Sequence, residues 1–149
     1  MDSMASQTPQ PDLVDGLVQL SFLVQSVLAE AAAAHTLTVP QIRLLGILRD
    51  REPGMLELAR HLGLDKSSAT GLVDRAERRG LVRRGSSDLD GRAVKVVTTP
   101  LGRELTETVG TEVITRIAAI AGALDPAGRE HLARLIGRIL GTRADVSNG

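Results

Sequence analysis

The stretch LARHLGLDKSSATGLVDRAERRGLVRR, residues 58–84, decides the fold that this sequence predicts. It begins as a short helix that stops near Gly63, and Asp65 is suited to cap a second helix that ends before Gly80. One face of the second helix is apolar, formed by Ala69, Leu72, Val73 and Ala76. The other face is small, polar and basic. A short helix, a three-residue turn with glycine and a second helix of this kind indicate a helix-turn-helix.

The hydrophobic period changes near Gly80, at the end of this stretch. GLVRRG (80–85) and RAVKVVT (92–98) are predicted to be two short strands, and SSDLDG (86–91) between them is rich in turn-forming residues. A helix-turn-helix followed by a basic β-hairpin is a winged helix. The predicted fold class is therefore mainly α with a small β-hairpin wing.

Helices are also predicted on both sides of the winged helix. Residues 12–35 are apolar on more than one face, more than a surface helix needs. Thr38 and Gln41 form a capping box at the start of a second helix. Pro100 opens a long helix to about Leu124, and a last helix follows with Gly141 as its stop. The winged helix alone is too small to cover the apolar surface of these outer helices, so we expect a second copy of the chain to cover it.

These elements give the expected domain organisation. The chain has 149 residues, which suits one domain. The expected parts are a disordered tail (1–11), a single domain (12–141) with dimerisation helices (12–35 and 100–141) around a winged helix-turn-helix (38–98), and a polar tail (142–149).

Composition narrows the functional class. The chain has no cysteine, which removes disulfides, Cys-type zinc clusters and Cys nucleophiles. Phe22 is the single aromatic residue, so stacking of bases on aromatic rings is not a main binding mechanism. The N-terminus lacks the basic and apolar regions of a signal peptide, and no apolar run approaches the roughly 18 residues of a membrane span. A cytoplasmic protein without membrane contact is expected.

Charge is unevenly distributed although the net charge is zero. Residues 60–103 contain ten Lys or Arg against five Asp or Glu, a net charge of +5, and the remainder carries −5. One basic third in a neutral chain is the asymmetry expected of a nucleic-acid-binding protein. A solvated surface is the alternative interpretation of such a cluster.

The combined pattern resembles the MarR family of bacterial winged-helix transcription regulators. The resemblance covers about residues 12–141 and rests on LVDRAERRGLVRR (72–84), on Asp90-Gly91-Arg92 and on the run VKVVTTPLG from Val94 to Gly102. It implies an obligate homodimer in which the first and last two helices interlock and two winged-helix lobes bind successive major grooves.

The resemblance also implies residues that contact DNA. Short hydroxyls at a helix N-terminus suit phosphates and base edges, and basic side chains suit phosphates. The candidates are Lys66, Ser67, Ser68, Thr70, Arg75, Arg78, Arg84, Arg92 and Lys95. Arg83 is a further candidate for phosphate contact. Arg92 at the tip of the wing is expected to enter the minor groove, with Asp90 as the residue that positions it.

Each of these candidates also has a structural interpretation. Serine and threonine favour helix starts as caps, an arginine at a hairpin tip can hold the turn together, and Asp74 and Arg78 can pair along one helix face. The family often carries arginines at positions that are Gly71 and Leu89 here. This difference keeps open the alternative that the chain is a winged-helix protein-interaction module with weak or non-specific DNA binding.

A small-molecule effector is common in the family, in a pocket near the first, second and fifth helices. Candidate lining residues are Phe22, His35, Arg43 and Leu44. Arg43 could pair with an acidic ligand, or it could be an ordinary surface residue. The three histidines are far apart in sequence, and no catalytic or phosphate-loop motif is present, so we expect no metal, no cofactor and no enzyme activity.

The function expected from the sequence is that of a homodimeric, sequence-specific regulator of transcription. We expect it to be a repressor that binds double-stranded DNA at a pseudo-palindromic operator and is released by a small-molecule effector.

Overall fold

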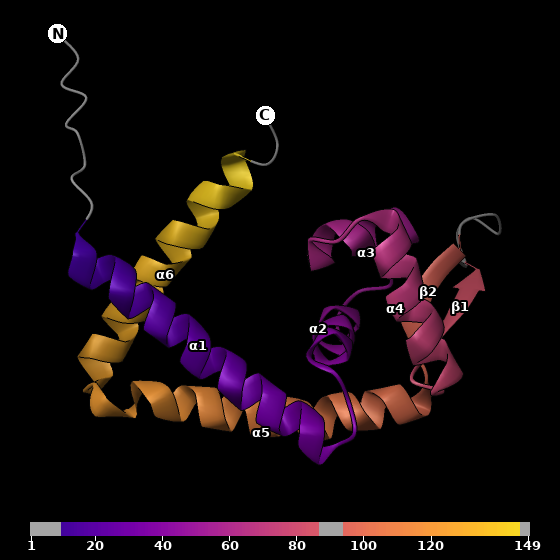
Figure 1. Cartoon of the computed structure of the whole chain (residues 1–149), viewed down its shortest axis with the longest axis horizontal. Helices are drawn as coiled ribbons and strands as arrows, with labels where there is room; N and C mark the ends of the chain where they lie inside the picture. The colour runs from indigo at the N-terminus through magenta and orange to yellow at the C-terminus, as the bar shows by residue number, and fades with distance from the viewer. Residues whose placement is uncertain (1–9, 87–93, 147–149) are drawn as a thin grey trace, which may run out of the picture. The chain divides into compact units, whose positions relative to one another are not determined.

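The structure is a computed structural model and describes residues 10–86 and 94–146. Its elements, in chain order, are α1 (Pro11–Ala34), α2 (Val39–Leu48), α3 (Met55–Leu62), α4 (Lys66–Arg78), β1 (Val82–Ser86), β2 (Val94–Thr98), α5 (Pro100–Ile120), a 3-10 turn (Ala121–Ala123) and α6 (Pro126–Val146) (Figure 1). This order confirms the predicted fold class.

The chain divides into two compact units. Unit 1 comprises residues 1–113 and holds α1 to β2 and the first part of α5. Unit 2 comprises residues 114–149 and holds the end of α5, the 3-10 turn and α6.

The core of unit 1 lies where α2, α3 and α4 meet the hairpin. Its largest fully buried aliphatic side chains are Leu44, Leu58, Val73, Leu81, Val82 and Val96. Ala31 and Ala32 of α1 and Val109 of α5 belong to the same cluster. Since the single aromatic residue, Phe22, is exposed, aliphatic packing stabilises the core, and truncating one of these leucines to alanine should cost about 2–5 kcal/mol.

Helix boundaries follow the signals in the sequence. The Thr38–Gln41 capping box is present at α2, with both reciprocal hydrogen bonds. Asp65 caps α4 by accepting a hydrogen bond from the Ser68 amide at 2.7 Å. Gly63 ends α3 at φ +66° and Gly80 follows α4 at φ +74°, left-handed conformations that glycine adopts without penalty.

The two strands pair antiparallel, with Arg83 opposite Val97 and Arg84 opposite Val96. Successive side chains of a strand point to opposite faces. Val82 and Val96 therefore lie on the buried face with Arg84, and Arg83 and Val97 lie on the other. The hairpin is also attached to the residues before α3, because the Val96 amide donates to the Pro53 carbonyl at 2.9 Å and Gly54 forms a bridge with Lys95.

Thr99 alone joins the hairpin to α5. Its hydroxyl accepts a hydrogen bond from the Gly102 amide at 3.0 Å and donates to the Gly80 carbonyl at 2.5 Å. The backbone of Gly102 approaches Leu81 so closely that a Cβ at residue 102 would lie 1.9 Å from the Leu81 carbonyl oxygen. Only glycine fits this position without displacing the strand.

The last helix extends beyond the expected stop at Gly141. α6 continues to Val146, into the segment expected to be a polar tail. A glycine ends a helix when it takes a left-handed conformation, and among the described residues only Gly63 and Gly80 do so. The first helix begins one residue earlier than expected, at Pro11, a favoured residue for a first helical position. Residues 1–9 of the expected N-terminal tail and residues 147–149 lie outside the described residues.

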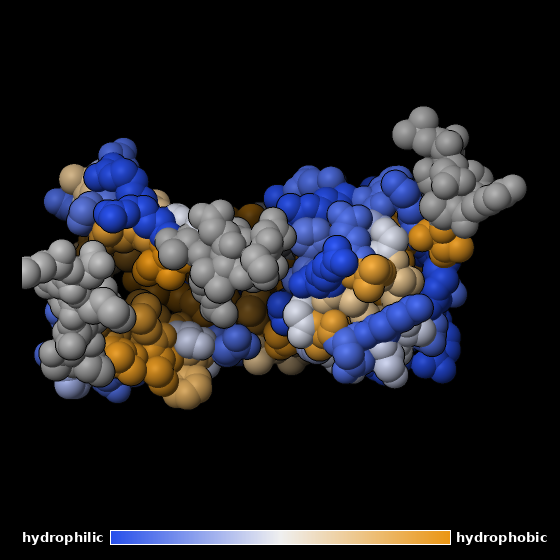
Figure 2. Space-filling model, turned by 90° about the horizontal axis from the view of Figure 1, so that it is seen from above, coloured by the Kyte–Doolittle hydropathy of each residue, from blue (hydrophilic) through white to orange (hydrophobic). Residues whose placement is uncertain are grey.

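Hydrophobic side chains on the outer helices remain uncovered in the single chain, as the orange surface outside the winged helix shows (Figure 2). In α1 the residues concerned include Leu13, Leu17, Leu20 and Phe22. In α6 they are Leu135, Ile136, Ile139 and Leu140.

The length and composition of α1 correct one expectation. Among the described residues it is the one helix long and apolar enough to cross a membrane, whereas the sequence was expected to hold no such segment. A helix that packs against a protein partner passes the same test, so this property alone is weak evidence for a membrane span.

Candidate nucleic-acid interface

The N-terminus of α4 presents the hydroxyl groups predicted to contact DNA. Lys66, Ser67 and Ser68 are exposed, and Thr70 is half-buried. The opposite face of α4, with Ala69, Leu72, Val73 and Ala76, is buried as predicted. Since the first amides of a helix and its partial positive charge point outward at this end, the site suits a phosphate or an acceptor on a base edge.

Asp65 controls the chemistry of this helix end. Its carboxylate accepts a hydrogen bond from the Ser68 amide and another from the Ser68 hydroxyl, the latter at 3.1 Å. These hydrogen bonds, the backbone one first, lower the pKa of Asp65 below its ordinary value. The Ser68 hydroxyl proton is thus engaged by Asp65 and its oxygen is left as an acceptor, whereas Ser67 has no side-chain partner among the described residues.

Arg75 covers the position of Gly71 on the exposed face of α4. A Cβ added to Gly71 would lie 3.3 Å from an Nη atom of Arg75, so the guanidinium extends across the space that a larger residue at 71 would fill. Arg78, one turn further along, is exposed as well. Two guanidinium groups are therefore available on the face that carries the predicted contacts.

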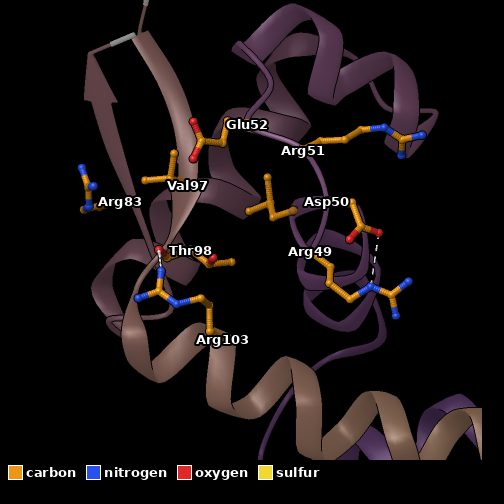
Figure 3. Close-up of a pocket in the computed structure, with 9 residues that line it drawn as sticks. Arg49, Asp50, Arg51, Glu52, Arg83, Val97, Thr98 and Arg103 are labelled. Carbon is orange, nitrogen blue, oxygen red and sulfur yellow. Dashed lines mark hydrogen bonds and ion pairs between the residues drawn. The ribbon is translucent and has the colours of Figure 1, made fainter. Parts of the chain in front are cut away.

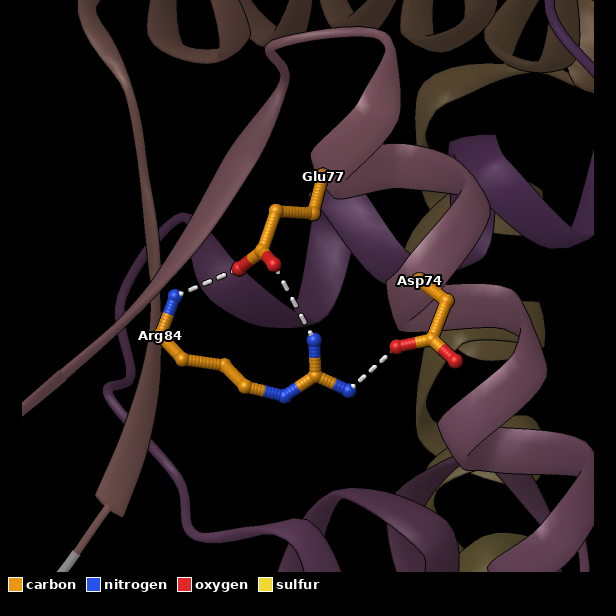
Figure 4. Close-up of polar contacts among 3 residues, drawn as sticks. All are labelled: Asp74, Glu77 and Arg84. Atoms are coloured by element: carbon orange, nitrogen blue, oxygen red, sulfur yellow. Dashed lines mark hydrogen bonds and ion pairs between the residues drawn. The ribbon is translucent and has the colours of Figure 1, made fainter.

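Arg84 joins the hairpin to α4 (Figure 4). Its guanidinium donates to Asp74 at 2.7 Å and to Glu77 at 3.3 Å, and its backbone amide donates to Glu77 at 3.0 Å. The spacing of Asp74 and Arg78 in the sequence allows them to form an ion pair, but in the structure Asp74 pairs with Arg84 instead. The carboxylates of Asp74 and Glu77 thus bind the Arg84 side chain, which was expected to contact phosphate. In this structure Arg84 holds the wing against α4.

The remaining wing candidates divide between described and undescribed residues. Lys95 is half-buried on β2, opposite Gly85, on the face of the hairpin that points away from Arg84. Arg92 and Asp90 lie outside the described residues, as does Leu89.

Arg79 is a structural residue that the sequence interpretation missed. It lies at the end of α4 and donates to the carbonyl of Thr36 and to the side chain of Gln41, the latter at 3.4 Å. Thr36 has a left-handed φ of +56°, which is unfavourable for a β-branched residue. The run of charges around Arg79 gives no signal of this contact, because its partners lie about 40 residues earlier in the chain.

The four residues expected to line an effector pocket have different environments. Phe22 is 66% exposed on α1, while Leu44 is fully buried in the core. His35 lies 3.0 Å from a carboxylate oxygen of Glu112 on α5, and Arg43 donates to the carbonyl of Leu62 at 3.3 Å. Leu44 thus has no surface with which to line a cavity in this conformation. Among the described residues, no group of three or more His, Asp or Glu could hold a metal ion.

Comparisons with known proteins agree with this architecture. The model of the MarR family matches residues 35–93. The crystal structure of the transcriptional regulator PA4135 is 26% identical, with a TM-score of 0.73 over 90% of this chain and 98% of that one. NadR in complex with 4-hydroxyphenylacetate is 26% identical, with a TM-score of 0.66 over 93% and 97% of the two chains.

A third solved structure shares the fold at lower identity. BpsR of Bordetella bronchiseptica, whose DNA binding is regulated by 6-hydroxynicotinic acid, is 22% identical, with a TM-score of 0.70 over 89% of this chain and 94% of that one. No curated protein sequence matches the chain. Residues 35–93 therefore match the MarR family, and the chain shares the fold of solved winged-helix transcriptional regulators.

Proposed function

We propose that the chain is a homodimeric, cytoplasmic repressor that binds a pseudo-palindromic operator sequence-specifically. The observation that carries this proposal is the end of α4. Exposed hydroxyls and cations lie around a capped helix N-terminus whose opposite face is anchored in the core. A helix held in this way can enter a major groove as a rigid element.

In this proposal each part of the interface has its own role. Ser67 and Ser68 contact base edges or phosphates, with Lys66 on a phosphate and Thr70 beside them. Arg75, lying over Gly71, supplies the guanidinium nearest the centre of the helix and suits a guanine edge. Arg78 and Lys95 contact phosphates, and Arg92, positioned by Asp90, enters the minor groove. Arg84 acts indirectly, through the position of the wing.

The proposed dimer is formed by the outer helices. Both α1 and α6 expose large aliphatic side chains along their length in the single chain. Exposed apolar patches of this extent are typical of interfaces rather than of free surfaces. The two copies of α4, related by twofold symmetry, would then bind operator half-sites about 10–10.5 base pairs apart.

An effector that shifts the population of DNA-competent dimers completes the proposal. NadR and BpsR are both described with small aromatic acids. In this chain the effector site is proposed near His35, Arg43 and Phe22, at the junction of α1, α2 and α5. The His35–Glu112 contact between α1 and α5 is the polar link that a ligand acid could disturb.

The experiment that tests the function measures binding of the full-length protein to fragments of its own upstream region. A scrambled duplex of equal length is the control, and each titration is run at two salt concentrations. We expect tight binding that resists competitor DNA and weakens with salt, because phosphate contacts release counterions. If genome-wide selection of bound fragments yields no common sequence, the protein-interaction module is the better description.

A further inference from the structure

A cleft of about 460 Å³ lies beside the hairpin in unit 1. It is bordered by residues 49–52 after α2, by the hairpin and by the start of α5 (Figure 3). Leu48 and Val97 provide its apolar surface, and Thr98 and Glu52 belong to its polar lining. The volume is within the range of small-molecule sites, roughly 300–1,000 Å³.

The lining of this cleft is more basic than the chain as a whole. Four arginines and two acidic residues line it, a net charge of +2 in a chain whose net charge is zero. The arginines come from three separate elements: Arg49 and Arg51 from the segment after α2, Arg83 from β1 and Arg103 from α5. Tertiary folding, not a local run of sequence, brings them together.

These arginines keep most of their hydrogen-bonding capacity. Arg103 donates to the Thr98 carbonyl at 3.2 Å, which occupies one of its five N–H groups. Within residues 10–86 and 94–146, the one ion pair of Arg49 is with its neighbour Asp50, at 3.3 Å, and this pair is exposed enough to be worth little. Among the described residues Arg83 has no side-chain hydrogen bond or ion pair. Arg51 extends away from the hairpin in Figure 3 and is left out of the binding set.

The cleft does not lie on the surface proposed to bind DNA. Arg84 points to α4 and pairs with its carboxylates, and Arg83 is the next residue back along the same strand. Because adjacent strand residues face opposite sides, Arg83 and Val97 lie on the side of the hairpin away from α4. A ligand held there would not compete with the N-terminus of α4 for the same space.

We propose that this cleft binds a small organic anion, a carboxylate or a phosphate ester with an apolar part. The planar guanidinium groups of Arg83 and Arg103 match the oxygens of such an acid. Val97 and Leu48 contact the apolar part, and Glu52 accepts a hydrogen bond from a hydroxyl or amino group of the ligand. This site is separate from the effector site near His35 and does not depend on the proposed operator binding.

Calorimetric titration of the DNA-free, full-length protein tests the site. The probes are phenyl phosphate, benzoate and inorganic phosphate. We expect one saturable site per chain for phenyl phosphate, with weaker binding of inorganic phosphate because it lacks the apolar part. Arg83→Gln and Arg103→Gln should each weaken phenyl phosphate binding by about tenfold or more, the loss expected for a charged hydrogen bond. Arg129→Gln, at an exposed arginine on α6, should bind as the wild type does.

Several results would overturn the proposal. These are the absence of saturable binding by any probe, and equal loss of binding in the Arg129 control. Arg103→Gln also removes the contact to Thr98, so Arg83→Gln, which removes no hydrogen bond or ion pair between described residues, is the decisive variant if Arg103→Gln unfolds. Operator binding of the same variant distinguishes a free small anion from a DNA phosphate as the ligand of Arg83. Arg83→Gln should leave operator affinity within about twofold, and a larger loss with a shallower salt dependence would show that Arg83 holds a DNA phosphate instead.

Discussion

Glu77 of α4 accepts two hydrogen bonds from Arg84 of β1, one from its backbone amide and one from its guanidinium. A single carboxylate therefore fixes both the path of the strand and the direction of its side chain. Asp74, one helical turn earlier, holds the other arm of the guanidinium. Helix α4 and the hairpin are thus joined by a polar clamp formed by Asp74, Glu77 and Arg84.

This clamp predicts that Arg84→Ala reduces DNA affinity without removing a DNA contact. The free energy of unfolding should fall by about 1–2 kcal/mol, since charged hydrogen bonds on a partly buried arginine are lost. Denaturant unfolding and operator titration measure the two effects. In a cycle with Glu77→Ala the effects should be strongly non-additive, and the salt slope of DNA binding should be unchanged. A slope reduced by about one would mean that Arg84 itself binds phosphate.

Gly102→Ala, at the start of α5, should be more damaging than other substitutions that add one methyl group near the hairpin. The new Cβ would meet the Leu81 carbonyl, so the strand or α5 must move, at a cost of about 1–3 kcal/mol or more. Gly46→Ala is the matched control, at an exposed position inside α2 with nothing within 4 Å of the added carbon. It should stabilise the protein by up to about 1 kcal/mol. Similar thermal midpoints for the two variants would refute the close approach of Gly102 to Leu81.

Stability should depend on pH through Asp65. The hydrogen bonds from Ser68 make its folded-state pKa lower than its unfolded-state pKa. Its contribution is therefore fully present above the ordinary value of 3.8 and is lost as the pH falls through the lowered pKa of the folded state. Asp65→Asn keeps a good N-cap without the charge, so its thermal midpoint should fall less than that of the wild type between pH 5 and about pH 2.5. Parallel curves for the two proteins would contradict this assignment.

Ser67→Ala and Ser68→Ala should separate capping from DNA contact. Neither substitution removes the backbone cap from the Ser68 amide to Asp65, so both variants should remain close to wild type in stability. If a hydroxyl contacts a base edge, its loss should cost about 1–3 kcal/mol of operator binding and relax the preference at one base pair. Selection of bound sequences from a randomised operator measures this preference. An unchanged preference in both variants would leave the two serines with a structural role only.

The proposed dimer predicts a contrast between two exposed leucines. Leu17 on α1 is 51% exposed and Leu56 on α3 is 60% exposed in the single chain. Leu17→Asp should raise the dimer dissociation constant by at least about tenfold, because it places an unpaired charge in an apolar interface. Leu56→Asp, outside the proposed interface, should leave it unchanged. Sedimentation velocity over a concentration series measures both, and equal behaviour of the two variants would place the interface elsewhere.

Local signals made most of the fold predictable. The caps at Thr38 and Asp65 and the glycines after α3 and α4 act over three or four residues, so their effect can be worked out from the sequence alone. The change of period after Gly80 likewise predicted both strands of the hairpin. The end of α6 was wrong because glycine only permits a helix to stop, and the residues after Gly141 continue it.

The contacts within the site were less predictable because they join distant parts of the chain. Arg84 was interpreted as one more cation in a basic run, and nothing local distinguishes it from Arg83. The fold makes the difference, turning one side chain to the carboxylates of α4 and the other to the cleft. The approach of Gly102 to Leu81 is equally invisible without the packing of α5 on the strand.

The single-residue connection at Thr99 has a mechanical consequence. A flexible linker between the wing and α5 would let each of them make small motions without moving the other. Here the Thr99 hydroxyl is hydrogen-bonded on one side to the carbonyl of Gly80, which follows α4, and on the other to the first turn of α5. The hairpin and the start of α5 are therefore expected to move together, so that a tilt at the start of α5 changes the orientation of the hairpin.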